Sequence, residues 1–317
     1  MPMPSLKEPP RFASRFWGLM KGVTTSVVLF GSLLVINVLQ TSLLLIKPFS
    51  SIAFRKLNRE IANFWWGWCD SWVVLFFGLK VTFSGDDPPA RENALVLPNH
   101  QEMTDIVVMF NFAHKKSRLG DMKWFAKDII KYVPGVGWGM LFLDCLFVRR
   151  DWTRDQAMIK RVFENISKYR IPLWLLTFVE GTRAKPEKIR QSRKYAEKAG
   201  MPPLEHLLTP RTKGFVATVE NLSGHLDAVY DVTIGYIDGV PTLWQWIKGY
   251  VKEVNVHVRR YEMKDLPEGD EALSKWLHTR YEEKDAILSA YFETGVFPKS
   301  GALPENDDSR ENRLIQA

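Results

Sequence analysis

The stretch ALVLPNHQEMTD, residues 94–105, places a short apolar segment before a proline and a group of polar side chains. Residues 94–97 are typical of a buried strand that Pro98 ends, and residues 103–113 continue as a helix. The polar residues between them therefore lie on a loop that enters a helix. Five helical steps would put His100 and Asp105 about 140° apart. For the two side chains to meet, His100 must lie ahead of the helix and fold back.

Contact between His100 and Asp105 would create a general base. Asp105 would fix the tautomer of the imidazole and support its positive charge, while the other ring nitrogen takes a proton from a hydroxyl. By itself this pattern is weak, because a chain with six histidines can contain such a pair by chance.

A second informative stretch is LWLLTFVEGTR, residues 173–183. Its continuous apolar run is typical of a strand buried on both faces. Glu180 and Arg183 end this strand, and the carboxyl ends of strands form the binding crevice of α/β sheets. Gly181 permits close backbone approach, and Arg183 can hold a phosphate through paired donors. The alternative is an ordinary salt bridge at a strand end.

Further basic segments follow the same logic. Arg149 and Arg150 come after the apolar strand 145–148, and residues 210–214 (PRTKG) form another basic loop. One of the two arginines can bind phosphate, and the alternative is two solvated side chains. We expect the strands before Arg150 and Arg183 to be adjacent, so that both guanidinium groups bind one dianionic phosphate.

The rest of the chain alternates between strand and helix patterns. Strands are expected at residues 80–83, 228–236 and, as an edge strand, 254–259. Helices are expected at residues 153–169, 185–198 and 271–292, and a glycine-rich loop at 134–139. This alternation predicts an α/β fold with a mostly parallel sheet flanked by helices. The domain would cover residues 84–298, followed by a polar tail at 299–317.

The N-terminal part predicts a membrane anchor after a basic segment, residues 1–21. Residues 22–46 carry no charged side chain, and a helix of that length reaches about 37 Å, more than a hydrocarbon core of about 30 Å. Such a helix spans the bilayer or lies in one leaflet. Basic residues flank both of its ends, so charge does not fix its orientation.

Residues 61–79 form a second apolar segment, rich in tryptophan at helical spacing. Tryptophan prefers the headgroup level, so we predict an interfacial helix. Residues 22–83 would then anchor the chain together. A second span and a core helix under the catalytic domain are the alternatives.

Composition narrows the classes of function. The formal net charge of +7 favours an anionic partner such as nucleic acid, a membrane surface or a phosphorylated substrate. Cys69 and Cys145 form neither a disulfide framework nor a metal-ligand pattern. The sequence has no G-x-S-x-G elbow, P-loop or G-x-G-x-x-G motif, which argues against serine hydrolases and nucleotide-binding folds.

Together these motifs resemble the 1-acylglycerol-3-phosphate acyltransferase family of glycerolipid synthesis. The N-H-x-x-x-x-D pattern, the F-V-R-R and F-V-E-G-T-R strand ends and the D-V-T-I strand near Asp231 follow the family's order over roughly residues 85–240. The stretches LLTPRTKGF, AVYDVTI and WLHxxYxEKDA resemble the branch that includes eukaryotic lysophosphatidic acid and lysocardiolipin acyltransferases. Asp144 departs from the pattern, because many members have glycine there.

The resemblance implies a glycerolipid acyltransferase fold and specific roles. His100 would be the general base and Asp105 its partner. The residues implied to bind the phosphate and glycerol of the acceptor, with the neighbouring arginine included, are Arg149, Arg150, Glu180, Gly181, Thr182 and Arg183. No metal and no cofactor is implied, because acyl-CoA or an acyl carrier protein thioester enters as a co-substrate.

The implied reaction moves a fatty acyl group from acyl-CoA to the free hydroxyl of a lysophospholipid, foremost 1-acyl-sn-glycerol-3-phosphate, to give phosphatidic acid. The implied partners are the lysophospholipid acceptor, the acyl-CoA donor and membrane lipid, and not nucleic acid. The location would be the endoplasmic reticulum membrane in a eukaryote and the inner membrane in a bacterium. Remodelling of lysophosphatidylinositol or lysocardiolipin is the enzymatic alternative, and a catalytically silent membrane lipid-binding protein is the non-enzymatic one.

Overall fold

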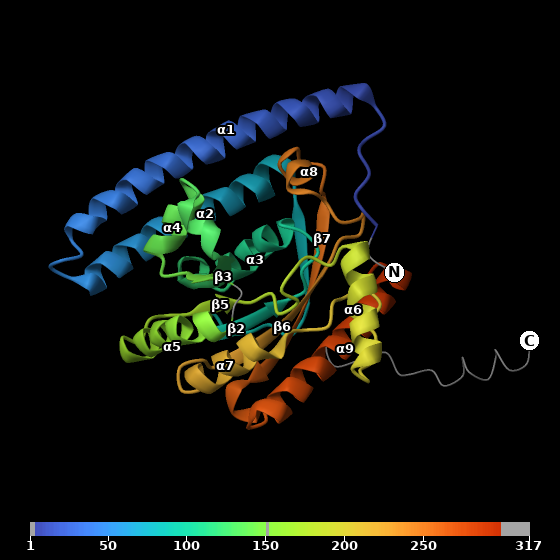
Figure 1. The fold of residues 1–317 in the computed structure, drawn as a ribbon. Coiled ribbons are helices and arrows are strands. Elements are labelled where there is room, and N and C mark those ends of the chain that lie inside the picture. The colour runs from blue at the N-terminus through green and yellow to red at the C-terminus, as the bar shows by residue number, and fades with distance from the viewer. Residues whose placement is uncertain (1–3, 150–151, 299–317) are drawn as a thin grey trace, which may run out of the picture.

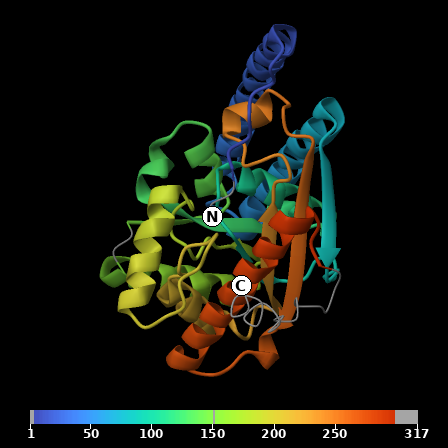
Figure 2. The same cartoon turned by 90° about the vertical axis from the view of Figure 1, so that its right-hand side faces the viewer.

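The computed structural model describes residues 4–149 and 152–298, and within them a sheet of seven strands has helices on both faces (Figures 1 and 2). The strand order is β1-β7-β6-β2-β5-β3-β4, and every neighbouring pair is parallel except β6 and β7. The predicted fold class, a mostly parallel α/β sheet, is confirmed. The predicted tail, residues 299–317, lies outside the described residues.

The elements follow one another along the chain with short connections. The strands are β1 (Lys80–Gly85), β2 (Ala94–Pro98), β3 (Met122–Lys127), β4 (Leu146–Val148), β5 (Trp174–Leu176), β6 (Ala228–Gly235) and β7 (Glu253–Glu262). The α-helices are α1 (Phe12–Ser42), α2 (Ser51–Phe77), α3 (Thr104–Lys115), α4 (Val136–Phe142), α5 (Trp152–Lys168), α6 (Pro186–Lys198), α7 (Thr212–Leu222), α8 (Leu243–Ile247) and α9 (Asp270–Thr294).

Strand β2 lies in the middle of the sheet and is covered on both faces. Successive side chains of a strand point to opposite faces. Ala94 and Val96 accordingly pack into the core that α2 and α3 share, and Leu95 and Leu97 pack into the core under α5, α7 and α9. All four side chains are almost fully buried. The loop that follows β2, which carries His100, therefore starts from a firmly packed strand.

Helix α2 buries one face in the core and exposes the other. Ala62, Trp66 and Val73 belong to the core on the α3 side of the sheet, whereas Phe64 and Leu75 on its other face are 71% and 82% exposed. The helix begins at Ser51, ten residues before the predicted interfacial segment, because the side chain of Ser50 caps its first turn.

Helix α1 lies along the rest of the protein and contacts α2, α4 and α8 (Figure 1). Helical residues 12–45 are long and apolar enough to cross a membrane, judged by length and composition. Glycines allow α1 to pack closely at two places. Gly18 of α1 touches the ring of Tyr250, and Leu33 of α1 lies against Gly135. It starts at Phe12 and thus includes residues that the sequence analysis assigned to the basic segment.

Three predictions about local structure were wrong. Residues 134–139 are not a loop throughout, because Gly135 at φ +82° starts helix α4 at Val136. The strand predicted at residues 254–259 is not an edge strand, since β1 pairs with β7 on one side and β6 pairs with it on the other. The strands expected to lead to Arg150 and Arg183, β4 and β5, are not adjacent, because β3 lies between them.

Candidate active site

His100 and Asp105 meet at the carboxyl end of β2. The Nδ1 atom of His100 lies 3.1 Å from Oδ2 of Asp105, and the imidazole stacks on the ring of Phe178 with centroids 4.0 Å apart. Asp105 is fully buried in the first turn of α3, and the backbone N–H groups of Gln101 and Glu102 donate to the same Oδ2 at 2.6 and 2.9 Å. These two bonds fold the loop back, so the predicted contact between His100 and Asp105 is present.

The pair fixes the orientation of the imidazole. An ionised carboxylate only accepts hydrogen bonds, so Nδ1 of His100 carries the hydrogen that points at Asp105. No residue in the described part of the chain forms a hydrogen bond with Nε2 of His100, and the side chain keeps 13% of its surface exposed. Nε2 is therefore the nitrogen that can accept a proton from a substrate.

Tyr236 completes the support of Asp105, and the sequence analysis missed it. Its hydroxyl donates to Oδ1 of Asp105 at 2.7 Å, and Thr104 Oγ1 lies 3.2 Å from the same hydroxyl. Burial, together with the nearby Asp105 charge, raises the pKa of Tyr236 well above its usual value, so the phenol keeps its hydrogen. The only sequence signal was its place directly after the D-V-T-I strand.

Glu180 holds the backbone of His100. Its carboxylate is 2% exposed and accepts from the N–H of His100 at 2.8 Å and from the N–H of Leu208 at 3.2 Å. Burial raises the pKa of Glu180 to about 8. The N–H of Ala184 donates in turn to the carbonyl of His100 at 2.7 Å. The segment after β5 thus forms hydrogen bonds with both the N–H and the carbonyl of His100. The predicted contact of Glu180 with an acceptor stays a prediction.

Gly181 takes a conformation and a position that suit only glycine. Its φ is +70°, and a Cβ there would lie 2.9 Å from Nε of Arg211. Arg211 comes from the basic loop 210–214 and is exposed, and its own N–H donates to the carbonyl of Val179 at 2.8 Å. Thr182, next to Gly181, is half-buried.

Glu102, two residues after His100, forms ion pairs with two cations. Arg183 and Lys185 both pair with its carboxylate, while 44% and 49% of their side chains stay exposed. Burial raises the pKa of Glu102, but hydrogen bonds from Lys185, from the N–H of Met103 and from Arg183 outweigh it, so its pKa lies below the usual value. One carboxylate and two cations leave a net positive charge open to solvent. Glu102 and Lys185 were not predicted as site residues.

The predicted arginine pair is described only in part. Arg149 follows the outer strand β4, is 63% exposed and lies 3.8 Å from Oδ2 of Asp128. Arg150 lies outside the described residues. Since β3 separates β4 from β5, the argument that adjacent strands bring Arg150 and Arg183 to one phosphate fails. Phosphate binding by either residue stays a prediction.

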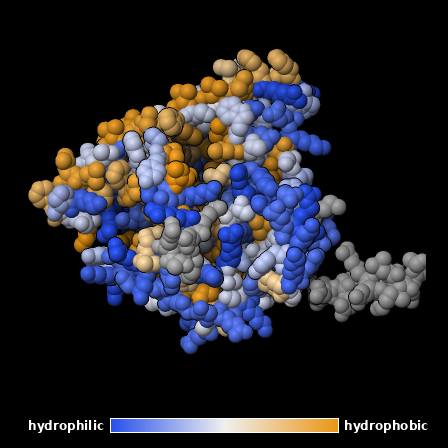
Figure 3. Space-filling view, in the orientation of Figure 1, coloured by the Kyte–Doolittle hydropathy of each residue, from blue (hydrophilic) through white to orange (hydrophobic). Residues whose placement is uncertain are grey.

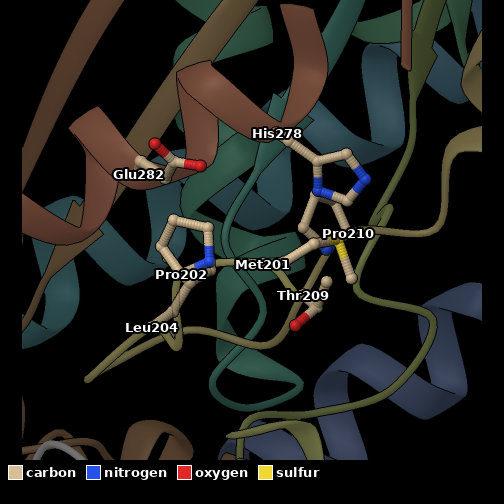
Figure 4. A pocket seen from close by; sticks show the side chains of 7 residues that line it. All are labelled: Met201, Pro202, Leu204, Thr209, Pro210, His278 and Glu282. Carbon is tan, nitrogen blue, oxygen red and sulfur yellow. The ribbon is translucent and has the colours of Figure 1, made fainter. Parts of the chain in front are cut away.

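The small cavity in Figure 4 is separate from the His100 site. It holds about 20 Å³, room for roughly one water molecule. It opens between the loop before Arg211 and helix α9, and its lining is Met201, Pro202, Leu204, Thr209, Pro210, His278 and Glu282 (Figure 4). The cavity is too small for an acyl chain.

A histidine fixed by an aspartate at the end of a central parallel strand, beside exposed cations, is a candidate general-base site of an α/β enzyme. Comparisons with known proteins agree. The family model described as Acyltransferase matches residues 80–237, and the model described as Acyltransferase C-terminus matches residues 245–316.

Named relatives identify the family. The chain is 34% identical to 1-acyl-sn-glycerol-3-phosphate acyltransferase 2 of Arabidopsis thaliana, over 87% of this chain and 73% of that protein. It is also 34% identical to 1-acyl-sn-glycerol-3-phosphate acyltransferase delta of Mus musculus, over 87% of this chain and 75% of that protein. The chain belongs to the 1-acyl-sn-glycerol-3-phosphate acyltransferase family and is an O-acyltransferase of phospholipid biosynthesis. This confirms the resemblance to that family.

A solved structure has the same fold. It is the crystal structure of the 1-acyl-sn-glycerophosphate acyltransferase from Thermotoga maritima. The likeness has a TM-score of 0.53 at 18% identity and covers 87% of this chain and 98% of that one.

Proposed function

We propose that the protein transfers a fatty acyl group from acyl-CoA to the free hydroxyl of 1-acyl-sn-glycerol-3-phosphate, which gives phosphatidic acid. The observation that carries this proposal is the His100–Asp105 pair, with Nδ1 held at 3.1 Å and Nε2 left for a substrate. The names of the relatives support the acceptor, because they are 1-acyl-sn-glycerol-3-phosphate acyltransferases of plants and mammals.

The proposed reaction needs one base and no covalent intermediate on the protein. Nε2 of His100 takes the hydroxyl proton as the acceptor oxygen attacks the thioester carbonyl carbon. A tetrahedral intermediate forms, the C–S bond breaks, and the new ester remains. The thiolate needs little help to leave, because a thiol has a pKa of about 8.5, and it takes its proton from the imidazolium. Asp105 stabilises the imidazolium throughout.

The exposed cations beside His100 suit the phosphate of this acceptor. Arg183 and Lys185 present donors to solvent while Glu102 holds them in place. An arginine can bind two phosphate oxygens at once. An acceptor phosphate bound there would bring its hydroxyl to the histidine.

We infer that α1 is embedded in one leaflet of a membrane and does not cross it. Gly18 touches Tyr250 and Gln40 faces Gly139, so contacts with one globular domain extend from residue 18 to residue 40 of α1, about 33 Å of helix. If α1 crossed the bilayer, the domain beside it would have to cross as well. Figure 3 shows the apolar surface that fits this placement, gathered over α1, α2 and α4. Val27 and Val38 on α1 and Trp138 on α4 are 68%, 69% and 44% exposed.

The test is transfer activity in detergent micelles. Purified protein receives labelled acyl-CoA and, in separate reactions, lysophosphatidic acid, lysophosphatidylinositol or monolysocardiolipin. We expect labelled phosphatidic acid as the main product, and none with His100→Ala. A larger rate with one of the other two acceptors would replace the proposed acceptor. Activity above a few per cent of wild type in folded His100→Ala would remove the proposed base.

A further inference from the structure

The motif E-K-D-A on α9 contains two buried charged side chains that the proposed mechanism does not use. Lys284 is 0% exposed and Asp285 is 7% exposed. Burying an ammonium or a carboxylate costs several kcal/mol unless it is paired and hydrogen-bonded. Their placement inside the protein therefore calls for a specific role.

Lys284 binds the strand that carries the catalytic loop. Its Nζ donates to the carbonyl of Leu97 at 2.7 Å and to that of Val232 at 2.9 Å, and it forms an ion pair with Oδ1 of Asp231 at 2.6 Å. Leu97 is the third residue before His100, and Val232 lies on β6. The ammonium thus ties the end of β2 to β6 directly below the catalytic loop.

Asp285 binds the segment that braces Glu180. Its carboxylate accepts from three successive N–H groups, those of Glu205, His206 and Leu207, at 2.6, 2.8 and 3.1 Å. The next N–H, that of Leu208, donates to Glu180 at 3.2 Å.

The other oxygen of Glu180 accepts from the N–H of His100 at 2.8 Å. Asp285 therefore reaches His100 through one loop and one carboxylate, while Lys284 reaches it through the strand. Two adjacent residues of one helix thus hold the strand that leads to His100 and the loop whose next N–H binds Glu180.

We propose that Lys284 and Asp285 are positioning residues for acyl transfer, which hold the His100 loop and its Glu180 brace in register with Asp105. This role gives helix α9, which lies within the Acyltransferase C-terminus match, a part in the reaction. The proposal rests on the proposed function of His100. Since a displacement of about 1 Å can cost about 100-fold in rate, losing either anchor should reduce kcat and spare substrate affinity.

The chain offers a matched control at the other end of the same strand. Glu92, two residues before β2, is buried and pairs with Arg260, whose Nε lies 2.9 Å from Oε2 of Glu92. Arg260→Met removes a half-buried cation from its ion pair with a buried carboxylate on the same sheet, but far along the strand from His100. Lys284→Met removes the corresponding cation at the catalytic end.

The experiment compares full-length Lys284→Met, Asp285→Asn and Arg260→Met in micelles, at a temperature where each is folded. We expect kcat to fall tenfold or more in the first two, with KM for acceptor and donor changed less than about threefold. Arg260→Met should lose comparable thermal stability and keep kcat within about twofold. Should Lys284→Met not fold, Asp285→Asn carries the comparison.

Hydrogen exchange separates this proposal from the proposed function. The amides of His100, Gln101 and Glu102 should exchange faster in Lys284→Met than in wild type, and the amides of residues 205–208 faster in Asp285→Asn, with neither change in Arg260→Met. Unchanged exchange at these amides, or equal kcat losses in all three variants, would overturn the positioning role. Activity in His100→Ala would instead overturn the assignment of the base.

Discussion

The hydroxyl of Tyr236 donates a hydrogen bond of 2.7 Å to Oδ1 of Asp105, whose other oxygen faces His100. Asp105 therefore accepts from a side chain on each oxygen, and two backbone N–H groups complete its bonds. A buried carboxylate with this many donors has little freedom to rotate. Tyr236, directly after β6, bonds the side chain of Asp105, whereas Glu180, after β5, bonds the backbone N–H of His100.

Tyr236→Phe removes one donor to a buried charge and leaves the ring in place. A hydrogen bond to a charged group contributes about 1.5–3 kcal/mol, so the free energy of unfolding should fall by that order. We expect kcat to drop about tenfold with little change in KM, because Asp105 holds the imidazole less firmly. Steady-state kinetics and thermal unfolding measure both effects.

Tyr230→Phe is the control for that variant. Tyr230 lies on β6, away from His100, and its hydroxyl donates to the buried carboxylate of Glu92. Tyr230→Phe should lower the free energy of unfolding about as much as Tyr236→Phe does, without lowering kcat. Full kcat in Tyr236→Phe would limit Tyr236 to a structural role.

The raised pKa of Glu180 should make stability depend on pH. Burial lifts this pKa from 4.5 to about 8, so the folded protein binds the proton more tightly than the unfolded chain. The resulting stabilisation is complete below about pH 4.5 and is lost as the pH rises through about 8. Glu180→Gln cannot titrate, so its free energy of unfolding should fall less than that of wild type between pH 5 and pH 8.

Denaturant unfolding at the two pH values tests this, with Glu187→Gln as the control. Glu187 is exposed on α6, so its removal should leave the pH dependence of wild type almost unchanged. A pH dependence equal in wild type and Glu180→Gln would mean that Glu180 is ionised over the whole range.

Much of the sheet could be read from the sequence because its strands are buried on both faces. The run that became β2 is continuous and apolar and ends at Pro98, and the run that became β6 is apolar apart from Asp231 and Thr233, so their type and place were predictable. Strand β3 was missed because its sequence, MKWFAK, mixes lysines with apolar residues. Lys123 is nevertheless buried, since its Nζ bonds the carbonyl of Leu143.

The candidate site was predictable where its residues are close in sequence. His100 and Asp105 lie five positions apart, so contact between them was possible only with the loop folded back, as the structure has it. Tyr236 and the bond between Glu180 and His100 depend on which strands are neighbours, and the sequence does not contain the strand order. The same gap explains why the strands before Arg150 and Arg183 were wrongly taken as adjacent.

The one-leaflet placement of α1 predicts that both of its ends lie on the same side of a membrane. Lys7 precedes α1 and Lys47 follows it, and both are exposed. In a background with Cys69→Ala and Cys145→Ala, we expect Lys7→Cys and Lys47→Cys to react equally with a membrane-impermeant maleimide added outside reconstituted vesicles. Lys188→Cys on α6 reports the side of the catalytic domain. Reaction of only one α1 end in intact vesicles, with both reacting after detergent, would show that α1 crosses the bilayer.

The last prediction concerns Arg183, which Glu102 holds while 44% of its side chain stays exposed. Arg183→Lys keeps the charge and the pairing with Glu102 but loses the planar fork that binds two phosphate oxygens. We expect the KM for lysophosphatidic acid to rise about five- to tenfold, with the KM for acyl-CoA nearly unchanged. Arg190→Lys is the control, because Arg190 is 71% exposed on α6 and pairs with Glu187. A defect confined to the KM for acyl-CoA would assign Arg183 to the phosphates of the donor and reverse the places of the two substrates.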